Sequence, residues 1–180
     1  MPADAPDLPA LRAMLKSQYH AALAMLRDAV EKCPDAIWEG GGHRNACWQH
    51  AYHALFFAHS YSRRDSESSE WWPGHVAETL NPDGIPGPPQ PGSALPLLPP
   101  AYSKEAVLAA CRFVDEGIDA AVDSMDLGSA ESGFPWYPIP KLEHQIVNLR
   151  HIQHHAAQIA DRVRKEADVG VRWVGARRAR

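Results

Sequence analysis

The residues best suited to chemistry are two histidines in the C-terminal third of the chain, His151 and His155. They stand four residues apart, so on a helix both side chains lie on one face, one turn from each other. That spacing allows two imidazoles to reach a single metal ion, as in helical zinc motifs. Two imidazoles do not complete a site, so the pattern predicts a third ligand elsewhere in the chain.

Two amides share the helical sector of this histidine pair. Asn148 lies three residues before His151, and Gln158 lies three residues after His155. From those positions an amide could orient an imidazole N–H or a bound ligand. The other interpretation, equally favoured by the sequence, is that both are solvated polar residues of an exposed helix face. His154 falls outside the sector and is not expected to bind the ion.

A second histidine-rich segment, residues 45–59, offers three choices for the third ligand. With about 100° of rotation per helical residue, His53 lies at the edge of the apolar side of this segment, and His50 points further towards solvent. His59 falls within the apolar arc, about a turn and a half further along. Geometry therefore favours His53, with His50 and His59 as the alternatives.

Four amphipathic segments must position these histidines. In each segment apolar residues recur at spacings of three and four, which is the pattern of a helix with one core-facing side. Asp7 and Ser103 are suited to cap the first and third helices. In the fourth, the apolar arc is expected at Leu142, Ile146, Leu149, Ala156 and Val163. The four helices are expected at residues 8–33, 45–62, 104–128 and 141–167.

A long connection, residues 63–100, separates the second and third helices. Its second part, residues 76–100, holds eight of the sixteen prolines, and no regular element fits there. Four helices with two short loops and one long crossover predict an all-α four-helix bundle in a single domain, residues 1–180. Because the crossover can span the length of the bundle, the expected helix order is up-down-down-up.

The bulk properties exclude several classes of protein. A net charge of -4 gives no electrostatic reason to expect nucleic acid. No run approaches the ~20 apolar residues of a membrane span, and the acidic N-terminus does not resemble a signal peptide, so a cytoplasmic location is expected. Cys33, Cys47 and Cys111 are odd in number and widely spaced, so each is expected to be a small buried hydrophobe. The basic end of the chain, residues 168–180, is expected to fray.

Two motifs resemble the DinB-like superfamily of metal-binding four-helix bundles. They are W-x-x-x-Y-H-x-L-F at residues 48–56 and L-R-H-x-x-H-H-x-x-Q at residues 149–158, and the likeness extends over most of the chain. The family pattern takes one histidine from the second helix and an HxxxH pair from the fourth. The resemblance therefore implies His53, His151 and His155 as the metal ligands.

One departure from the family pattern limits what else can be carried over. The family often has Arg-Gly between its last histidine and the glutamine, whereas this chain has Ala156-Ala157. The contacts that this arginine makes in the family are therefore not expected in this chain. The assignment of the metal ligands is unaffected.

Three neutral imidazoles leave the +2 charge of an ion intact and at least one coordination position open. Zinc or nickel is expected, although imidazole also suits copper and iron(II). The resemblance implies a metal-dependent transferase or isomerase, in which a low-molecular-weight thiol on the metal attacks a small electrophilic molecule. The alternative is a non-catalytic metal- or ligand-binding module, whose ion mainly joins the second helix to the fourth.

A homodimer is the expected assembly. The first helix and the long connection present apolar residues that the bundle need not bury by itself, and related bundles often pair. The residues concerned in the connection are Trp71, Trp72, Leu95, Leu97 and Leu98.

Overall fold

The computed structural model describes residues 7–40, 42, 45–65, 71–75 and 101–177. Within these residues every regular element is a helix, which confirms the expected all-α class. None of the described helices combines the length and the apolar character that a membrane crossing requires. The helices are α1 (Leu8–Lys32), α2 (Asp35–Trp38), α3 (Cys47–Tyr61), α4 (Lys104–Ser124) and α5 (Lys141–Ala167).

The helix ends follow from local chemistry. The Asp7 carboxylate accepts a hydrogen bond from the Ala10 N–H at 2.9 Å, and Ser103 caps α4 by accepting from the Ala106 N–H at 3.2 Å. Both predicted caps are therefore confirmed. The helix α2, which the sequence did not predict, is a single turn following Pro34 and is too short to show a periodic pattern.

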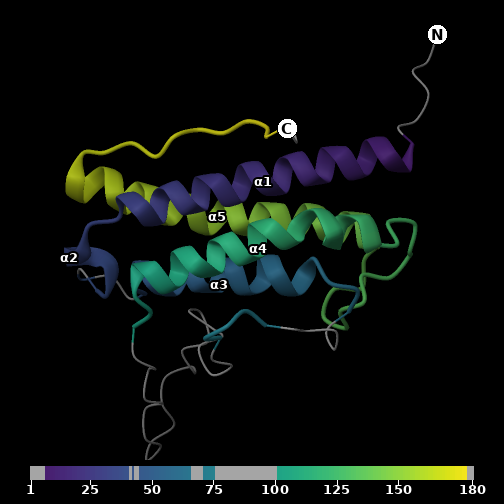
Figure 1. Ribbon diagram of the computed structural model, residues 1–180, viewed down its shortest axis with the longest axis horizontal. Helices are drawn as coiled ribbons and strands as arrows, with labels where there is room; N and C mark the ends of the chain where they lie inside the picture. The colour runs from purple at the N-terminus through teal and green to yellow at the C-terminus, as the bar shows by residue number, and fades with distance from the viewer. Residues whose placement is uncertain (1–6, 41, 43–44, 66–70, 76–100, 178–180) are drawn as a thin grey trace, which may run out of the picture.

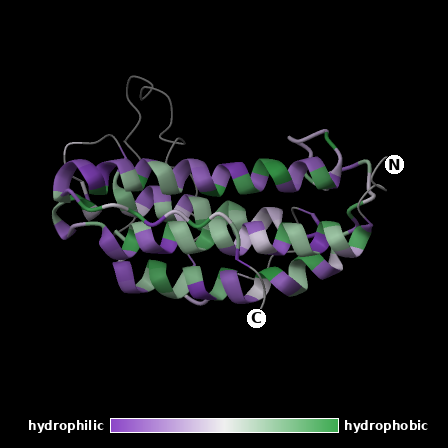
Figure 2. Cartoon of the chain, turned by 90° about the horizontal axis from the view of Figure 1, so that it is seen from above, coloured by the Kyte–Doolittle hydropathy of each residue, from purple (hydrophilic) through white to green (hydrophobic). Residues whose placement is uncertain are grey.

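The four long helices pack side by side. Figure 1 shows α1 and α5 running in one direction and α3 and α4 running in the other. The helix α5 packs against both α1 and α3, and α4 packs against the same two helices. Figure 2 shows hydrophilic and hydrophobic residues alternating along these helices, as expected when one side of each faces a common core.

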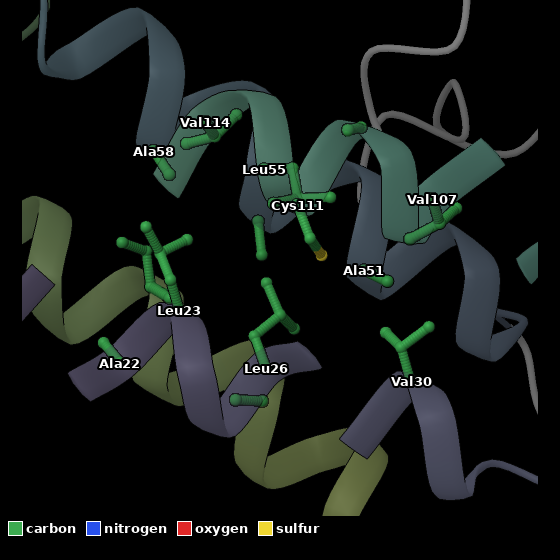
Figure 3. Packing of buried hydrophobic residues seen from close by; sticks show 14 of the residues in the cluster. Ala22, Leu23, Leu26, Val30, Ala51, Leu55, Ala58, Val107, Cys111 and Val114 are labelled. Carbon is green, nitrogen blue, oxygen red and sulfur yellow. The ribbon is translucent and has the colours of Figure 1, made fainter. Parts of the chain in front are cut away.

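Apolar side chains from several helices fill the space between them. Burying a side chain such as Leu26, which is 0% exposed, stabilises the fold by about 1.5–3 kcal/mol. Figure 3 shows these side chains pointing toward one another: Leu23, Leu26 and Val30 from α1; Ala51, Leu55 and Ala58 from α3; and Val107, Cys111 and Val114 from α4.

The first half of α5 buries amides where the sequence predicted an apolar arc. Ile146, expected in that arc, is 51% exposed, whereas Gln145 and Asn148 are fully buried. The reason is the hydroxyl of Tyr19 on α1, which donates to Gln145 Oε1 at 2.7 Å and accepts from Asn148 Nδ2 at 2.9 Å. Gln145 also donates to the Tyr61 carbonyl at 3.1 Å. Buried polar groups are tolerated when they are paired in this way.

The described part of the segment after α5 contacts α1. Figure 1 shows residues 168–177 returning along α1. The Arg172 N–H donates to Asp28 Oδ2 at 2.8 Å, and Lys32 Nζ donates to the Gly170 carbonyl at 2.9 Å. Side chains of α1 therefore bind the backbone of this segment. The frayed end expected for residues 168–180 stays a prediction, and residues 178–180 lie outside the described part.

Two tryptophans of the long connection cover α3 of their own chain. The Trp72 ring packs edge-on against Tyr52 with centroids 5.5 Å apart, and Trp71 stacks on Phe56 with centroids 4.5 Å apart. Trp72 is 5% exposed. Both rings therefore contact α3 of their own protomer, where Trp72 is buried and Trp71 is half-buried. The leucines expected there, residues 95, 97 and 98, lie outside the described residues.

Candidate metal centre

Three histidines from two helices meet at one point. His53 lies on α3, and His151 and His155 lie one turn apart on the facing side of α5. Their candidate ligand nitrogens all lie within 4.8 Å of one another. The Nε2 atom of His151 is 3.0 Å from Nε2 of His53 and 3.1 Å from Nε2 of His155. The three rings thus point the same kind of nitrogen at a common centre.

These separations fit a metal ion. Zinc binds imidazole nitrogen at about 2.0–2.1 Å in a tetrahedron, which places two such nitrogens roughly 3.3 Å apart. The observed 3.0 and 3.1 Å are close to that value. Only a small adjustment of the rings would be needed for an ion to sit between them. The three imidazoles could therefore hold one metal ion, whose identity the ligand type does not fix.

Gln158 fixes the orientation of one ring. Its Oε1 atom lies 2.8 Å from Nδ1 of His155. An amide oxygen accepts a hydrogen bond, so a proton on Nδ1 of His155 would donate to Gln158 and leave the Nε2 lone pair for the ion. Of the two interpretations of Gln158, the structure supports the orienting one.

Asn148, the other amide of the sector, forms its hydrogen bonds within the core. Its Nδ2 atom donates to the hydroxyl of Tyr19 and, at 3.3 Å, to the carbonyl of Ala58. It lies one turn from His151, but the hydrogen bonds that hold its side chain run to α1 and α3. The interpretation of Asn148 as a solvated polar residue is wrong, since its side chain is fully buried.

The burial of the three histidines is uneven. His53 and His155 are 6% and 3% exposed, whereas His151 is half-buried. The Phe57 ring packs edge-on against His53 and His151, with centroids 4.8 and 5.3 Å apart. Phe57, itself half-buried, thus flanks the centre, and His151 is the most exposed of the three histidines.

His50 is placed differently from the sequence prediction. It was expected to point towards solvent, but it is 4% exposed and its Nδ1 atom lies 3.2 Å from Nδ1 of His155. The guanidinium of Arg162 on α5 donates to its other nitrogen, Nε2, at 3.0 Å, and to the Asn45 carbonyl at 2.6 Å. A helical wheel misses this because the arginine that satisfies His50 comes from another helix.

The remaining histidines of the two segments lie away from the centre. His59 is 5% exposed and packs against the rings of Trp72 and Phe113, while its Nε2 atom accepts from Arg63 at 2.8 Å. His154 is exposed, as its position on the wheel predicted. The three histidines that were favoured therefore form the group that could hold an ion, whereas His50 contacts His155 through the Nδ1 atoms and His59 lies elsewhere.

Removing the orienting amide should weaken metal binding without abolishing it. In Gln158→Leu, the His155 ring loses the acceptor that fixes its tautomer, and such losses typically cost about 10- to 100-fold in metal affinity. Competition with a chromophoric chelator would measure the change. Gln153→Leu, five residues earlier on the same helix, is the matched control and should bind as the wild type does. An unchanged affinity in Gln158→Leu would show that this hydrogen bond does not orient the ligand.

No family model, curated protein or solved structure matches this chain. What the chain does is therefore argued from its residues and their geometry.

Proposed function

We propose that this chain is a DinB-like metal protein that binds one divalent transition ion, zinc or nickel, through His53, His151 and His155. Its activity would be that of a metal-dependent thiol transferase or isomerase acting on small electrophilic molecules. The observation that carries the proposal is the convergence of three Nε2 atoms, two pairs of which are 3.0 and 3.1 Å apart. The motif resemblance supports the same ligands.

The wider architecture is part of this proposal. We propose that the four long helices form a four-helix bundle with the up-down-down-up order of the DinB-like superfamily. The helix directions in Figure 1 support it, as does the position of the histidines on α3 and α5, the counterparts of the second and fourth bundle helices.

The residues of the centre suit such chemistry. When bound, an ion held by three neutral ligands would supply a positive charge that favours the thiolate form of a small thiol. Gln158 keeps the Nε2 lone pair of His155 available, and Phe57 shields one side from water. The half-buried His151 leaves an approach for the thiol and for the electrophile.

A non-catalytic binding module is the second proposal, and one observation favours it. The candidate ligands join α3 to α5, two helices that already pack closely along their length. A bound ion there would tie the two helices together and raise the stability of the fold, because it binds the folded chain only. In this case, no small thiol would need to reach the ion.

Thiol binding to the cobalt(II)-loaded protein separates the two proposals. A small thiol should produce a sulfur-to-metal charge-transfer band and release a proton, since the thiolate is the ligand. The band should be absent from His155→Ala. Because the chain has three cysteines, the same titration must be repeated with Cys33, Cys47 and Cys111 replaced by serine. No spectral change at saturating thiol would favour the binding module.

We also propose that the protein is a homodimer. With the two tryptophans committed to their own protomer, the remaining support is α1, which exposes 51% of Leu8 and 50% of Met14. Light scattering over a wide concentration range should report twice the mass of the chain, and a monomer throughout would rule the dimer out.

A further inference from the structure

A cavity lies between the end of α3 and the second half of α4. Its volume is about 610 Å³, within the range of roughly 300–1,000 Å³ that is usual for small-molecule sites. His59 of α3 faces α4 here, because its ring packs against Phe113 with centroids 5.6 Å apart. By contrast, His53 packs against His151 of α5. The cavity and the candidate metal centre therefore lie on different sides of α3.

The wall that α4 contributes is largely apolar and leaves room for a ligand. It includes Phe113, which is 37% exposed, and the small residues Gly117, Ala120 and Ala121. Among the described residues, no atom outside the backbone of α4 would lie within 4 Å of a Cβ atom at Gly117. An apolar wall with one exposed ring and open space beside it suits a small aromatic group.

The wall at the end of α3 carries positive charge. Arg63 and Arg64 line it, against the single carboxylate of Glu116 on α4. The guanidinium of Arg63 donates to Nε2 of the buried His59 at 2.8 Å, which anchors it at this wall. A planar guanidinium matches the two oxygens of a carboxylate, which it binds through two parallel hydrogen bonds. Charge and donor geometry therefore favour a carboxylate.

The carbonyl groups at the end of α3 would repel an anion if they faced it unpaired. Donors from α5 bind them instead. Gln145 donates to the Tyr61 carbonyl at 3.1 Å, and the ammonium of Lys141 donates to the carbonyls of Arg63 and Arg64 at 2.7 and 2.9 Å. These bonds offset the negative end of the helix, and Lys141 adds a positive charge there.

We propose that this cavity binds a small aromatic carboxylate, with the carboxylate at Arg63 and the ring against Phe113. Both groups of the ligand are needed. An exposed ion pair alone contributes little, and a single ring in an open cavity is only partly covered. The site is separate from the metal centre, and the proposal does not rest on the proposed function.

The test titrates phenylacetate into the full chain after a chelator and dialysis have removed metal, so that no ion holds the carboxylate. Calorimetry should show saturable binding of one molecule per chain. Phenylacetamide has the same shape without the charge, and acetate lacks the ring, so each should bind at least about tenfold more weakly. Equal affinities for phenylacetate and phenylacetamide would overturn the assignment of an anion. Absence of phenylacetate binding would overturn the proposal as a whole.

Substitutions at Gly117 test where the ligand lies. Gly117→Leu places a side chain in the open space beside α4 and should lower the affinity for phenylacetate at least about tenfold, because it fills the cavity. Gly117→Ala is the matched control, since it raises helix propensity similarly but adds one methyl group, and it should bind within about twofold of the wild type. Equal affinities in the two variants would show that the ligand does not occupy this cavity.

A substitution at Arg63 tests the partner of the carboxylate. Arg63→Gln should weaken the binding of phenylacetate about tenfold and leave that of phenylacetamide unchanged, because only the charged ligand loses a charged hydrogen bond. A purely structural role of Arg63 would weaken both ligands alike, and that outcome would overturn its assignment.

Discussion

Replacing His151 by alanine should abolish stoichiometric binding of a divalent ion. Its Nε2 atom is the one that lies close to both other rings, 3.0 Å from His53 and 3.1 Å from His155. Without it, two imidazoles remain, and these rarely hold zinc or nickel against competition from buffer and chelators. Metal content after dialysis should fall from one ion per chain to none, measured by inductively coupled plasma mass spectrometry.

The matched control for this substitution is His154→Ala. His154 lies on the same helix, next to His155, but is exposed. Both variants remove one imidazole from the same short segment, so effects on helix propensity and net charge are shared. We expect His154→Ala to retain one ion per chain. Equal loss of metal from the two variants would contradict the ligand assignment.

The identity of the third ligand is tested by a second pair of substitutions. His53→Ala should lose the ion as His151→Ala does, whereas His50→Ala should keep it with reduced affinity. The reason is geometric, because His50 contacts His155 through the Nδ1 atoms and not through the Nε2 atoms that converge on the centre. If His53→Ala retained one ion per chain, His53 would not be the third ligand.

Acid should destabilise the metal-free protein through a histidine outside the metal centre. His144 on α5 is fully buried, and among the described residues neither of its ring nitrogens has a hydrogen-bond partner. Its ring packs against those of Tyr61, Phe134 and Tyr137. Burial, together with the nearby positive charge of Lys141, lowers the pKa of His144 to about 4.

The sign and size of the effect follow from that lowered pKa. The folded chain holds His144 neutral down to about pH 4, whereas the unfolded chain protonates it near its ordinary value of 6.5. Between these values the unfolded state binds more protons, so the free energy of unfolding falls as the pH falls. The total contribution is about 3 kcal/mol, present above pH 6.5 and lost by pH 4.

The measurement compares denaturant unfolding at pH 7 and pH 4.5 in the presence of a chelator. His144→Leu keeps the apolar volume and removes the titrating group, so it should lose less stability on acidification than the wild type, by about 2–3 kcal/mol. His154→Leu, which removes an exposed histidine from the same helix, should retain the wild-type loss. The same loss in His144→Leu and the wild type would mean that this ring does not cause the acid sensitivity.

Lys141, one turn before His144, contributes at a different pH. Its ammonium donates to the carbonyls of Arg63, Arg64 and Ser132 at 2.7, 2.9 and 2.8 Å. Burial lowers its pKa to about 8 from 10.5, so its protonated form is disfavoured in the folded chain. The contribution of Lys141 to the free energy of unfolding therefore rises between about pH 8 and 10.5. The loss of stability between pH 6.5 and 4 is thus assigned to His144.

Features that repeat along a helix could be predicted from the order of the residues. The spacing of His151 and His155 placed both rings on one face, and the apolar period located the four long helices. The caps at Asp7 and Ser103 were readable because a helix N-terminus is satisfied by a side chain a few residues away. All of these depend on neighbours within one or two turns.

The pairing of polar groups between helices could not be predicted in this way and is seen only in the folded chain. The helical wheel of α3 predicted that His50 faces solvent, but the side chain is buried and accepts a hydrogen bond from Arg162 of α5. The wheel of α5 could not anticipate that a hydroxyl from α1 would let Gln145 enter the core. Periodicity reports how apolar a face is, whereas burial of a polar group depends on a partner from elsewhere in the chain.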